Sequence, residues 1–194
     1  MKLKYLIGIL HDIGRFKQIK EYDTLWDTDE MNHGEYGYKV LKDGLLYNFI
    51  DDKKYNNIIL ECVRCHNKIC IDDNLDDYTK LFLKIIRDAD KIDIFYVMIN
   101  EEIHDVNVDN ITDYSYNTIM NEKLIDYKDI TTDFELVLVI LCYIYDLNYK
   151  YSFEQIYIND YINKLINVYK YSDNAKVKLE KIRSKLNKYI EMRK

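Results

Sequence analysis

The chain has 194 residues, a formal net charge of −6 and a hydrophobic fraction of 48%. This length and apolar content suit one domain with a sizeable core. The negative charge argues against a dedicated nucleic-acid binder. The segment 164–194 is the exception, with ten Lys or Arg against three Asp or Glu, and we interpret it as a solvated helix face.

The composition also predicts the fold class and the compartment. The chain contains no proline and only five glycines, whereas β-rich folds need many turns built on these residues, so we predict an all-α fold. The most apolar segment, 134–147, is too short to span a membrane and contains charged residues. No signal peptide precedes the four cysteines, so we expect a cytoplasmic protein with free thiols.

The first predicted helix ends at a histidine–aspartate pair. Apolar residues recur at helical spacing over residues 3–10, so this helix places His11 and Asp12 at its C-terminal end. The following stretch, residues 14–32, is polar and has no clear periodicity. It predicts a loop that covers a site.

The next two predicted helices each carry a histidine at one end. An apolar stripe over residues 34–50 predicts a helix with His33 at its start. Residues 55–65 predict a third helix, which ends near His66. Three of the four histidines in the chain therefore lie at the ends of predicted helices.

The longest apolar-periodic run, residues 78–99, predicts a helix with a carboxylate in its middle. We expect its apolar face to contain Leu81, Ile85, Ala89 and Ile92. Asp90 lies in this helix, where a carboxylate is unexpected unless it has a partner. Asp88 is interpreted as a carboxylate on the helix surface or at the edge of a site.

Capping signals predict where the later helices begin. Thr132-x-x-Glu135 and Ser152-x-x-Gln155 each match the capping-box pattern, in which the hydroxyl and the acid or amide bond reciprocally to backbone N–H groups. Ser172 is a candidate N-cap for a last helix with apolar residues at helical spacing. No convincing strand is predicted.

Four segments of the sequence resemble the ordered motifs of one superfamily. The segments LIGILHDIGRF, NHGEYGYKVL, VRCHNKIC and IIRDADKIDIF are similar to those of the HD-domain superfamily of metal-dependent phosphohydrolases, most of all to a bacterial subgroup with HDIGRF and RDADK segments. The resemblance implies an HD-type helical bundle over residues 1–100. Residues 101–194 are then expected to form additional C-terminal helices that pack on the same domain.

The resemblance also implies a ligand set for one or two divalent metal ions. His11 and Asp12 match the paired motif, in which the aspartate bridges two ions, and Asp90 matches the aspartate that completes the first ion site. His33 and His66 match the histidines that hold a second ion together with Asp12. Imidazole and carboxylate ligands suit Mn, Fe, Co, Ni or Zn better than Ca, and Mg is the remaining candidate.

The function implied is hydrolysis of a small phosphorylated substrate, such as a nucleotide, a cyclic nucleotide or another phosphate ester. Asp12 would position the ions that activate a water for attack on phosphorus. Arg15 and Lys91 flank the ligands in the sequence, and we propose them for phosphate contact or charge neutralisation. No membrane partner is expected.

Two alternatives remain open. The superfamily usually supplies a further histidine upstream of the paired motif, and this chain starts ten residues before His11. The chain is therefore alternatively a degenerate HD domain that binds a nucleotide or a protein partner without catalysis. A structural zinc site formed by Cys62, Cys65, His66 and Cys70 is the weaker alternative, because such sites usually join two separate segments.

Overall fold

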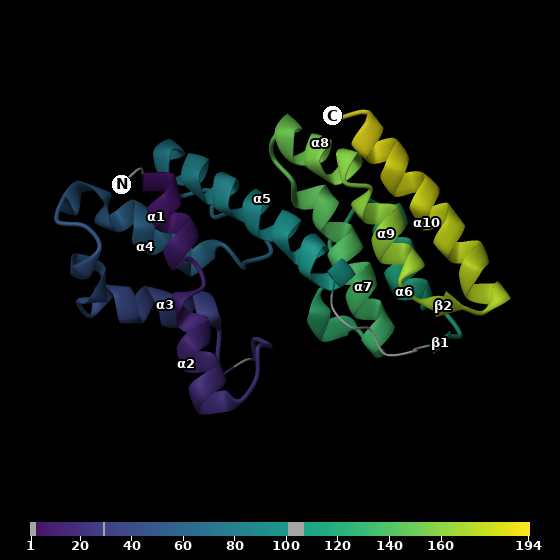
Figure 1. Cartoon of the computed structure of the whole chain (residues 1–194), viewed down its shortest axis with the longest axis horizontal. Helices are drawn as coiled ribbons and strands as arrows, with labels where there is room; N and C mark the ends of the chain where they lie inside the picture. The colour runs from purple at the N-terminus through teal and green to yellow at the C-terminus, as the bar shows by residue number, and fades with distance from the viewer. Residues whose placement is uncertain (1–2, 29, 101–106) are drawn as a thin grey trace. The chain divides into compact units, whose positions relative to one another are not determined.

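The computed structural model describes residues 3–28, 30–100 and 107–194, and its regular structure is almost entirely helical (Figure 1). The all-α prediction is confirmed. The only β-structure in the described residues is a two-residue parallel pair between β1 (Asn107–Val108) and β2 (Lys170–Tyr171). No helix within these ranges is both long and apolar enough to cross a bilayer.

The chain divides into two compact units, Met1–Arg87 and Asp88–Lys194. The division falls inside the long helix α5 (Asp77–Asn100), so each unit takes part of this helix. The predicted boundary between residues 100 and 101 stays a prediction.

The first unit combines short helices with a separate apolar core. Its elements are α1 (Leu3–Leu10), α2 (Ile13–Tyr22), α3 (His33–Lys42), η1 (Leu45–Asn48), η2 (Lys53–Tyr55), α4 (Asn56–Cys65) and the start of α5. The core contains Leu6, Ile7 and Leu10 of α1 together with buried residues of α3, α4 and α5. The helical spacing seen in residues 3–10 therefore predicts both the helix and its buried face correctly.

The prediction of a loop over residues 14–32 is wrong for its first part, because α2 covers Ile13–Tyr22. A Cβ atom added to Gly14 would lie 2.0 Å from the carbonyl oxygen of His33 and 2.7 Å from the backbone nitrogen of Gly37. The two helices α2 and α3 thus touch through backbone atoms at a glycine. Such a contact needs few apolar side chains, so it leaves little periodicity in the sequence.

Two other helix predictions need correction at their limits or faces. The helix predicted over 34–50 ends at Lys42, and Gly44 follows with a φ of 126°, a conformation that glycine adopts without strain. On α5 the buried face contains Leu83 and Ile86, whereas Leu81 is 42% exposed. The predicted stripe is therefore displaced from the face that joins the core.

The second unit is built around α7 and α10. Its elements are the rest of α5, β1, α6 (Asp113–Met120), η3 (Tyr127–Asp129), α7 (Asp133–Cys142), η4 (Tyr143–Asp146), α8 (Lys150–Ile158), α9 (Tyr161–Asn167), β2 and α10 (Asp173–Glu191). The apolar residues of α7 and α10 form one cluster with those of the neighbouring helices. Ser172 caps α10 as predicted, since its side chain accepts a hydrogen bond from the backbone of Ala175.

Neither predicted capping box forms. Thr132 makes no side-chain cap, and Glu135 instead accepts from the backbone and hydroxyl of Thr131 at 2.8 and 2.9 Å. Ser152 lies inside α8 and donates to Asp88 at 2.6 Å.

Asp88 is buried rather than on the helix surface, which corrects its predicted role. Besides Ser152, it accepts hydrogen bonds from the backbone nitrogens of Asn148 and Tyr149 at 3.0 and 3.1 Å. It therefore satisfies donors at the start of α8.

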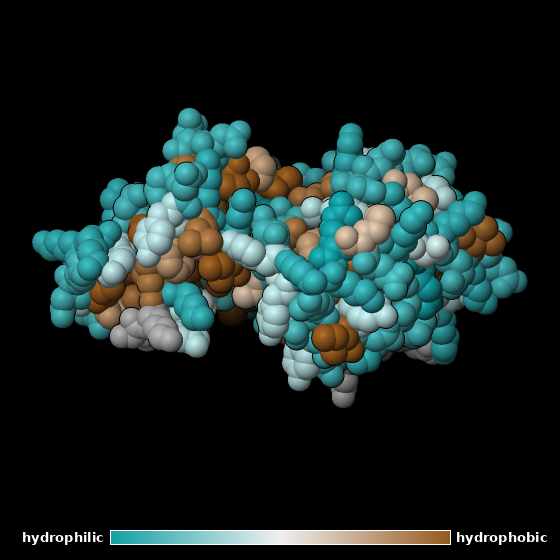
Figure 2. Space-filling model, turned by 90° about the horizontal axis from the view of Figure 1, so that it is seen from above, coloured by the Kyte–Doolittle hydropathy of each residue, from teal (hydrophilic) through white to brown (hydrophobic). Residues whose placement is uncertain are grey.

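Both units keep some large apolar side chains at the surface. The face shown in Figure 2 is mostly hydrophilic, with several apolar patches. Phe16 in the first unit and Ile158 in the second are 75% and 71% exposed. Single exposed apolar residues are normal in soluble folds and indicate no function by themselves.

Gly14→Ala tests the backbone contact between α2 and α3. The added methyl group would overlap the His33 carbonyl, so we expect the free energy of unfolding to fall by about 1–3 kcal/mol. Urea denaturation of the metal-free protein followed by circular dichroism measures this change.

Gly8→Ala is the matched control for this experiment. A Cβ atom at Gly8 meets nothing within 4 Å, and alanine is the better helix former, so this variant should be as stable as wild type or up to about 1 kcal/mol more stable. Equal stability of Gly14→Ala and wild type would show that the two helices do not pack closely at Gly14.

Candidate metal centre

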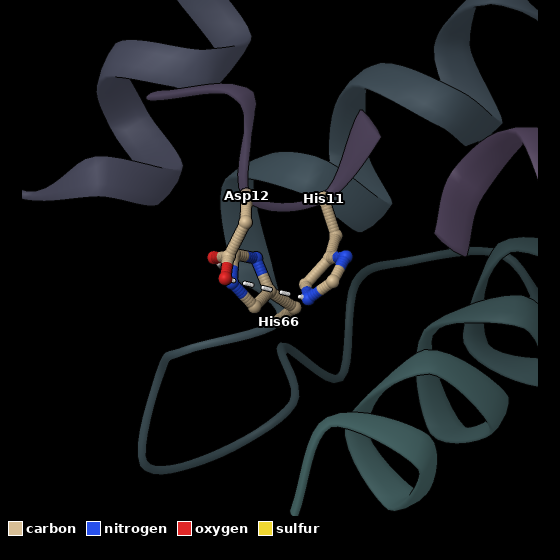
Figure 3. A group of neighbouring side chains, drawn as sticks. All are labelled: His11, Asp12 and His66. Carbon is tan, nitrogen blue, oxygen red and sulfur yellow. Dashed lines mark ion pairs between the residues drawn. The ribbon is translucent and has the colours of Figure 1, made fainter. Parts of the chain in front are cut away.

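The ends of four segments place three histidines and one aspartate together in the first unit. His11 follows the last turn of α1, Asp12 is the N-cap residue of α2, His33 is the first residue of α3, and His66 closes α4. Figure 3 shows that the side chains of His11, Asp12 and His66 point toward one another. Each of these three offers a ligand atom within 4.8 Å of the others.

The two oxygens of Asp12 face different imidazoles. Its Oδ1 lies 3.3 Å from Nε2 of His33 and 3.4 Å from Nε2 of His66, and these two nitrogens are 3.0 Å apart. Its Oδ2 lies 3.7 Å from Nε2 of His11. The carboxylate therefore faces all three imidazoles, His33 and His66 through Oδ1 and His11 through Oδ2.

The second ring nitrogen of each histidine is already engaged. Nδ1 of His11 lies 2.8 Å from the Gly8 carbonyl, and Nδ1 of His66 lies 2.8 Å from the Val63 carbonyl. A carbonyl only accepts, so these Nδ1 atoms carry the proton and Nε2 presents a lone pair. This orientation of imidazoles, with Nε2 directed to a common point, is typical of metal ligands.

The distances in this cluster fit a bound divalent transition metal ion. An ion with metal–nitrogen bonds of about 2.0–2.1 Å in tetrahedral geometry has ligand–ligand edges of about 3.3 Å. The edges between Asp12, His33 and His66 are 3.0, 3.3 and 3.4 Å. Asp12 Oδ1 is also a buried oxygen that accepts no hydrogen bond from the described residues, so a cation would satisfy it.

Electrostatics in the cluster favour a negative carboxylate. Burial raises the pKa of Asp12, but the close approach of the His33 and His66 imidazoles outweighs burial and holds this pKa well below its usual range. Burial lowers the pKa of His33, but the nearby carboxylates of Asp12 and Asp27 outweigh burial and raise this pKa above its ordinary value. The raised pKa favours a proton on His33, which can balance part of the negative charge of Asp12 when no ion is bound.

Asp27 is a site residue that the sequence did not reveal. Its Oδ1 lies 2.8 Å from Nδ1 of His33, on the side of the ring opposite Nε2. The only signal was a carboxylate in the polar stretch before His33, and many such carboxylates are solvated.

Arg15 lies beside the cluster, as its position in the sequence predicted. Its Nε is 3.4 Å from Asp12 Oδ1, and its Nη1 donates to the Leu25 carbonyl at 2.5 Å. The side chain is 31% exposed, so part of the guanidinium can face a ligand. Its contact with phosphate stays a prediction.

Asp90 and Lys91 belong to the second unit. Asp90 is half-buried on α5. Lys91 is buried, and its Nζ lies 2.9 Å from Asp146 Oδ2 and over the ring of Tyr143. The predicted roles of Asp90 as a metal ligand and of Lys91 as a phosphate contact stay predictions.

The cysteines of α4 are arranged as core residues. Cys62 and Cys65 are buried, Cys70 is exposed, and burial raises the pKa of the Cys62 thiol to about 12. Within residues 3–28, 30–100 and 107–194, the metal-ligand group contains imidazoles and a carboxylate but no thiol.

The fold and the cluster together define a helical domain with a candidate His/Asp metal site. Residues 1–94 match the sequence profile of the HD domain family, so the chain carries an HD domain over this segment, followed by more helices. HD domains generally bind divalent metal ions and are typically metal-dependent phosphohydrolases acting on phosphate esters. No curated protein and no solved structure matches the chain.

The resemblance to the HD-domain superfamily is confirmed for residues 1–94. Membership of the HDIGRF and RDADK subgroup stays a prediction.

Metal affinity should depend on pH through His33. A proton and a metal ion compete for Nε2, so affinity for Co²⁺ should fall as the pH drops through the raised pKa of His33. The free energy of unfolding of the metal-free protein should instead fall as the pH rises. The interactions of protonated His33 with its carboxylates contribute fully below pH 6.5, and they are lost as the pH rises through the raised pKa of His33 in the folded protein.

Co²⁺ titrations between about pH 6 and 9 measure the first dependence, and His33→Gln is the control. In this variant the midpoint of the pH dependence should move down, because the group with the raised pKa is gone. An unchanged midpoint would show that His33 does not compete for the ion.

Proposed function

We propose that this protein is a metal-dependent phosphohydrolase that acts on a nucleotide, a cyclic nucleotide or another small phosphate ester. The main support is Asp12, whose two oxygens face separate imidazoles while one of them is buried without a hydrogen bond from the described residues. A carboxylate in this setting fits a bridge between two cations.

We propose two ligand sets that share this carboxylate. His33 and His66 would hold one ion together with Asp12 Oδ1, and His11 and Asp90 would hold the other together with Asp12 Oδ2. Mn, Fe, Co, Ni, Zn and Mg are all candidates, and imidazole-rich sites favour the transition metals in this group.

When bound, such ions supply an activated water for attack on phosphorus and neutralise the phosphoryl oxygens. The side chains of the protein would hold the ions and the phosphate in place. Asp12 stays ionised because its neighbours lower its pKa, so it holds positive charge beside the reacting phosphate. Arg15 would add a charge-assisted hydrogen bond to a phosphate oxygen, since its guanidinium is partly exposed next to Asp12.

Asp12→Asn tests the proposed function with little change in shape. We expect the variant to lose bound transition metal and to lose at least about 100-fold of its phosphatase activity, because one of the shared charges is removed. Metal analysis of the purified protein and assays with p-nitrophenyl phosphate and with nucleoside mono- and cyclic monophosphates measure these losses.

Cys62→Ala is the control for metal bound elsewhere. Cys62 is a buried thiol outside the cluster, so this variant should keep its metal and its activity even if it is less stable. Metal lost from Cys62→Ala but retained in Asp12→Asn would indicate a zinc–thiolate site instead. Nucleotide binding without metal or turnover in wild type would overturn the enzyme proposal in favour of a binding domain.

A further inference from the structure

We propose that Asp27 is the positioning residue that makes His33 and His66 a pair of ligands for one ion. The inference rests on the proposed function, because it assumes that a metal ion binds between these imidazoles. Asp27 would not bind the ion itself; it contacts Nδ1 of His33, the ring nitrogen on the other side from the ion.

Asp27 holds His33 at two points. Its Oδ1 accepts from the backbone nitrogen of His33 at 2.9 Å, and its Oδ1 and Oδ2 lie 2.8 and 2.9 Å from Nδ1 of the same residue. The two contacts fix both the start of α3 and the rotation of the ring. Nε2 is then directed away from Asp27, toward Asp12 and His66.

The Oδ2 atom of Asp27 also ties this arrangement to the segment that carries His66. Asp27 Oδ2 accepts from the side-chain amide of Asn67 at 2.9 Å, and Asn67 directly follows His66. One carboxylate thus links two segments 40 residues apart in the chain. These are the two segments that carry His33 and His66, whose Nε2 atoms lie 3.0 Å apart.

His33 needs an outside carboxylate because of its place in a helix. His11 and His66 each lie at the C-terminal end of a helical stretch, and their Nδ1 atoms bond to carbonyls three residues earlier, at Gly8 and Val63. His33 begins α3, so no preceding helical turn offers it a carbonyl. Asp27 takes the place of that missing acceptor.

The segment around Asp27 is itself held by α2. Gln18, which is fully buried, donates to the Trp26 carbonyl at 2.9 Å and to Asp27 Oδ1 at 3.2 Å. Arg15 donates to the Leu25 carbonyl next to it. Asp27 is therefore fixed in place before any ion binds, as a positioning residue must be.

Asp27→Asn tests the inference by Co²⁺ binding to the full chain. We expect about 10–100-fold weaker binding, because an amide at residue 27 cannot accept with both of its polar atoms. The visible absorption of bound Co²⁺ and the quenching of Trp26 measure the affinity, and Trp26 is the only tryptophan in the chain.

Asp23→Asn is the matched control, with the same change of charge in the same segment. Asp23 is exposed and has a φ of 51°, a conformation that asparagine tolerates, so its Co²⁺ affinity should equal that of wild type. A similar loss in both variants would indicate a general charge effect and would overturn the role of Asp27.

A double variant separates positioning from general stability. If Asp27 acts mainly through His33, Asp27→Asn should weaken Co²⁺ binding much less in the His33→Gln background than in wild type, where only the link to the His66 segment is left to lose. A loss of equal size in both backgrounds would overturn the inference, because it would show that Asp27 acts without His33.

Two further results keep the test decisive. If circular dichroism shows that Asp27→Asn is unfolded, Asn67→Ala replaces it, since this variant removes the amide that bonds to Asp27 and leaves the carboxylate in place. Unchanged Co²⁺ affinity in Asn67→Ala would then overturn the inference. A wild-type chain that does not bind Co²⁺ would overturn the proposed function as well, whereas normal binding by both wild type and Asp27→Asn would overturn only the role of Asp27.

Discussion

The first unit depends on one electrostatic constraint, the meeting of three imidazole Nε2 atoms with one carboxylate, Asp12, whose Oδ1 atom is buried. Two of these nitrogens lie 3.0 Å apart, with Asp12 Oδ1 within 3.4 Å of both. Lone pairs and a negative charge at such distances repel one another unless a cation or a proton lies among them. The cluster formed by the three histidines and Asp12 is therefore suited to bind a cation.

Helix ends, rather than helix faces, bring these atoms together. His11 and His66 lie at C-terminal ends, where carbonyls of their own helices orient the rings. His33 lies at an N-terminal end and takes its orientation from Asp27. The close contact between α2 and α3 at Gly14 then brings the His33 end near Asp12. A larger residue at Gly14 would separate the very segments that carry the ligands.

The sequence predicts the parts of this site that local patterns encode. The helix over residues 3–10 shows in its apolar spacing, and the first three motif segments point to His11, Asp12, His33 and His66. Helix α2 could not be predicted in this way, because it packs through the backbone at Gly14 and needs no apolar stripe. The role of Asp27 could not be predicted either, since it depends on the side-chain amide of Asn67, 40 residues further along the chain.

Buried carboxylates elsewhere in the chain show why Asp12 differs. Glu135 accepts from three hydroxyls and a backbone nitrogen, and although burial raises its pKa, these bonds lower it to about 2. Asp88 similarly receives backbone, amide and hydroxyl donors around the start of α8. Both carboxylates are satisfied by the protein itself and need no ion. Asp12 Oδ1 instead lies among imidazole nitrogens and beside the Arg15 guanidinium, and it accepts no hydrogen bond from the described residues, so a metal ion or a protonated histidine would satisfy it further.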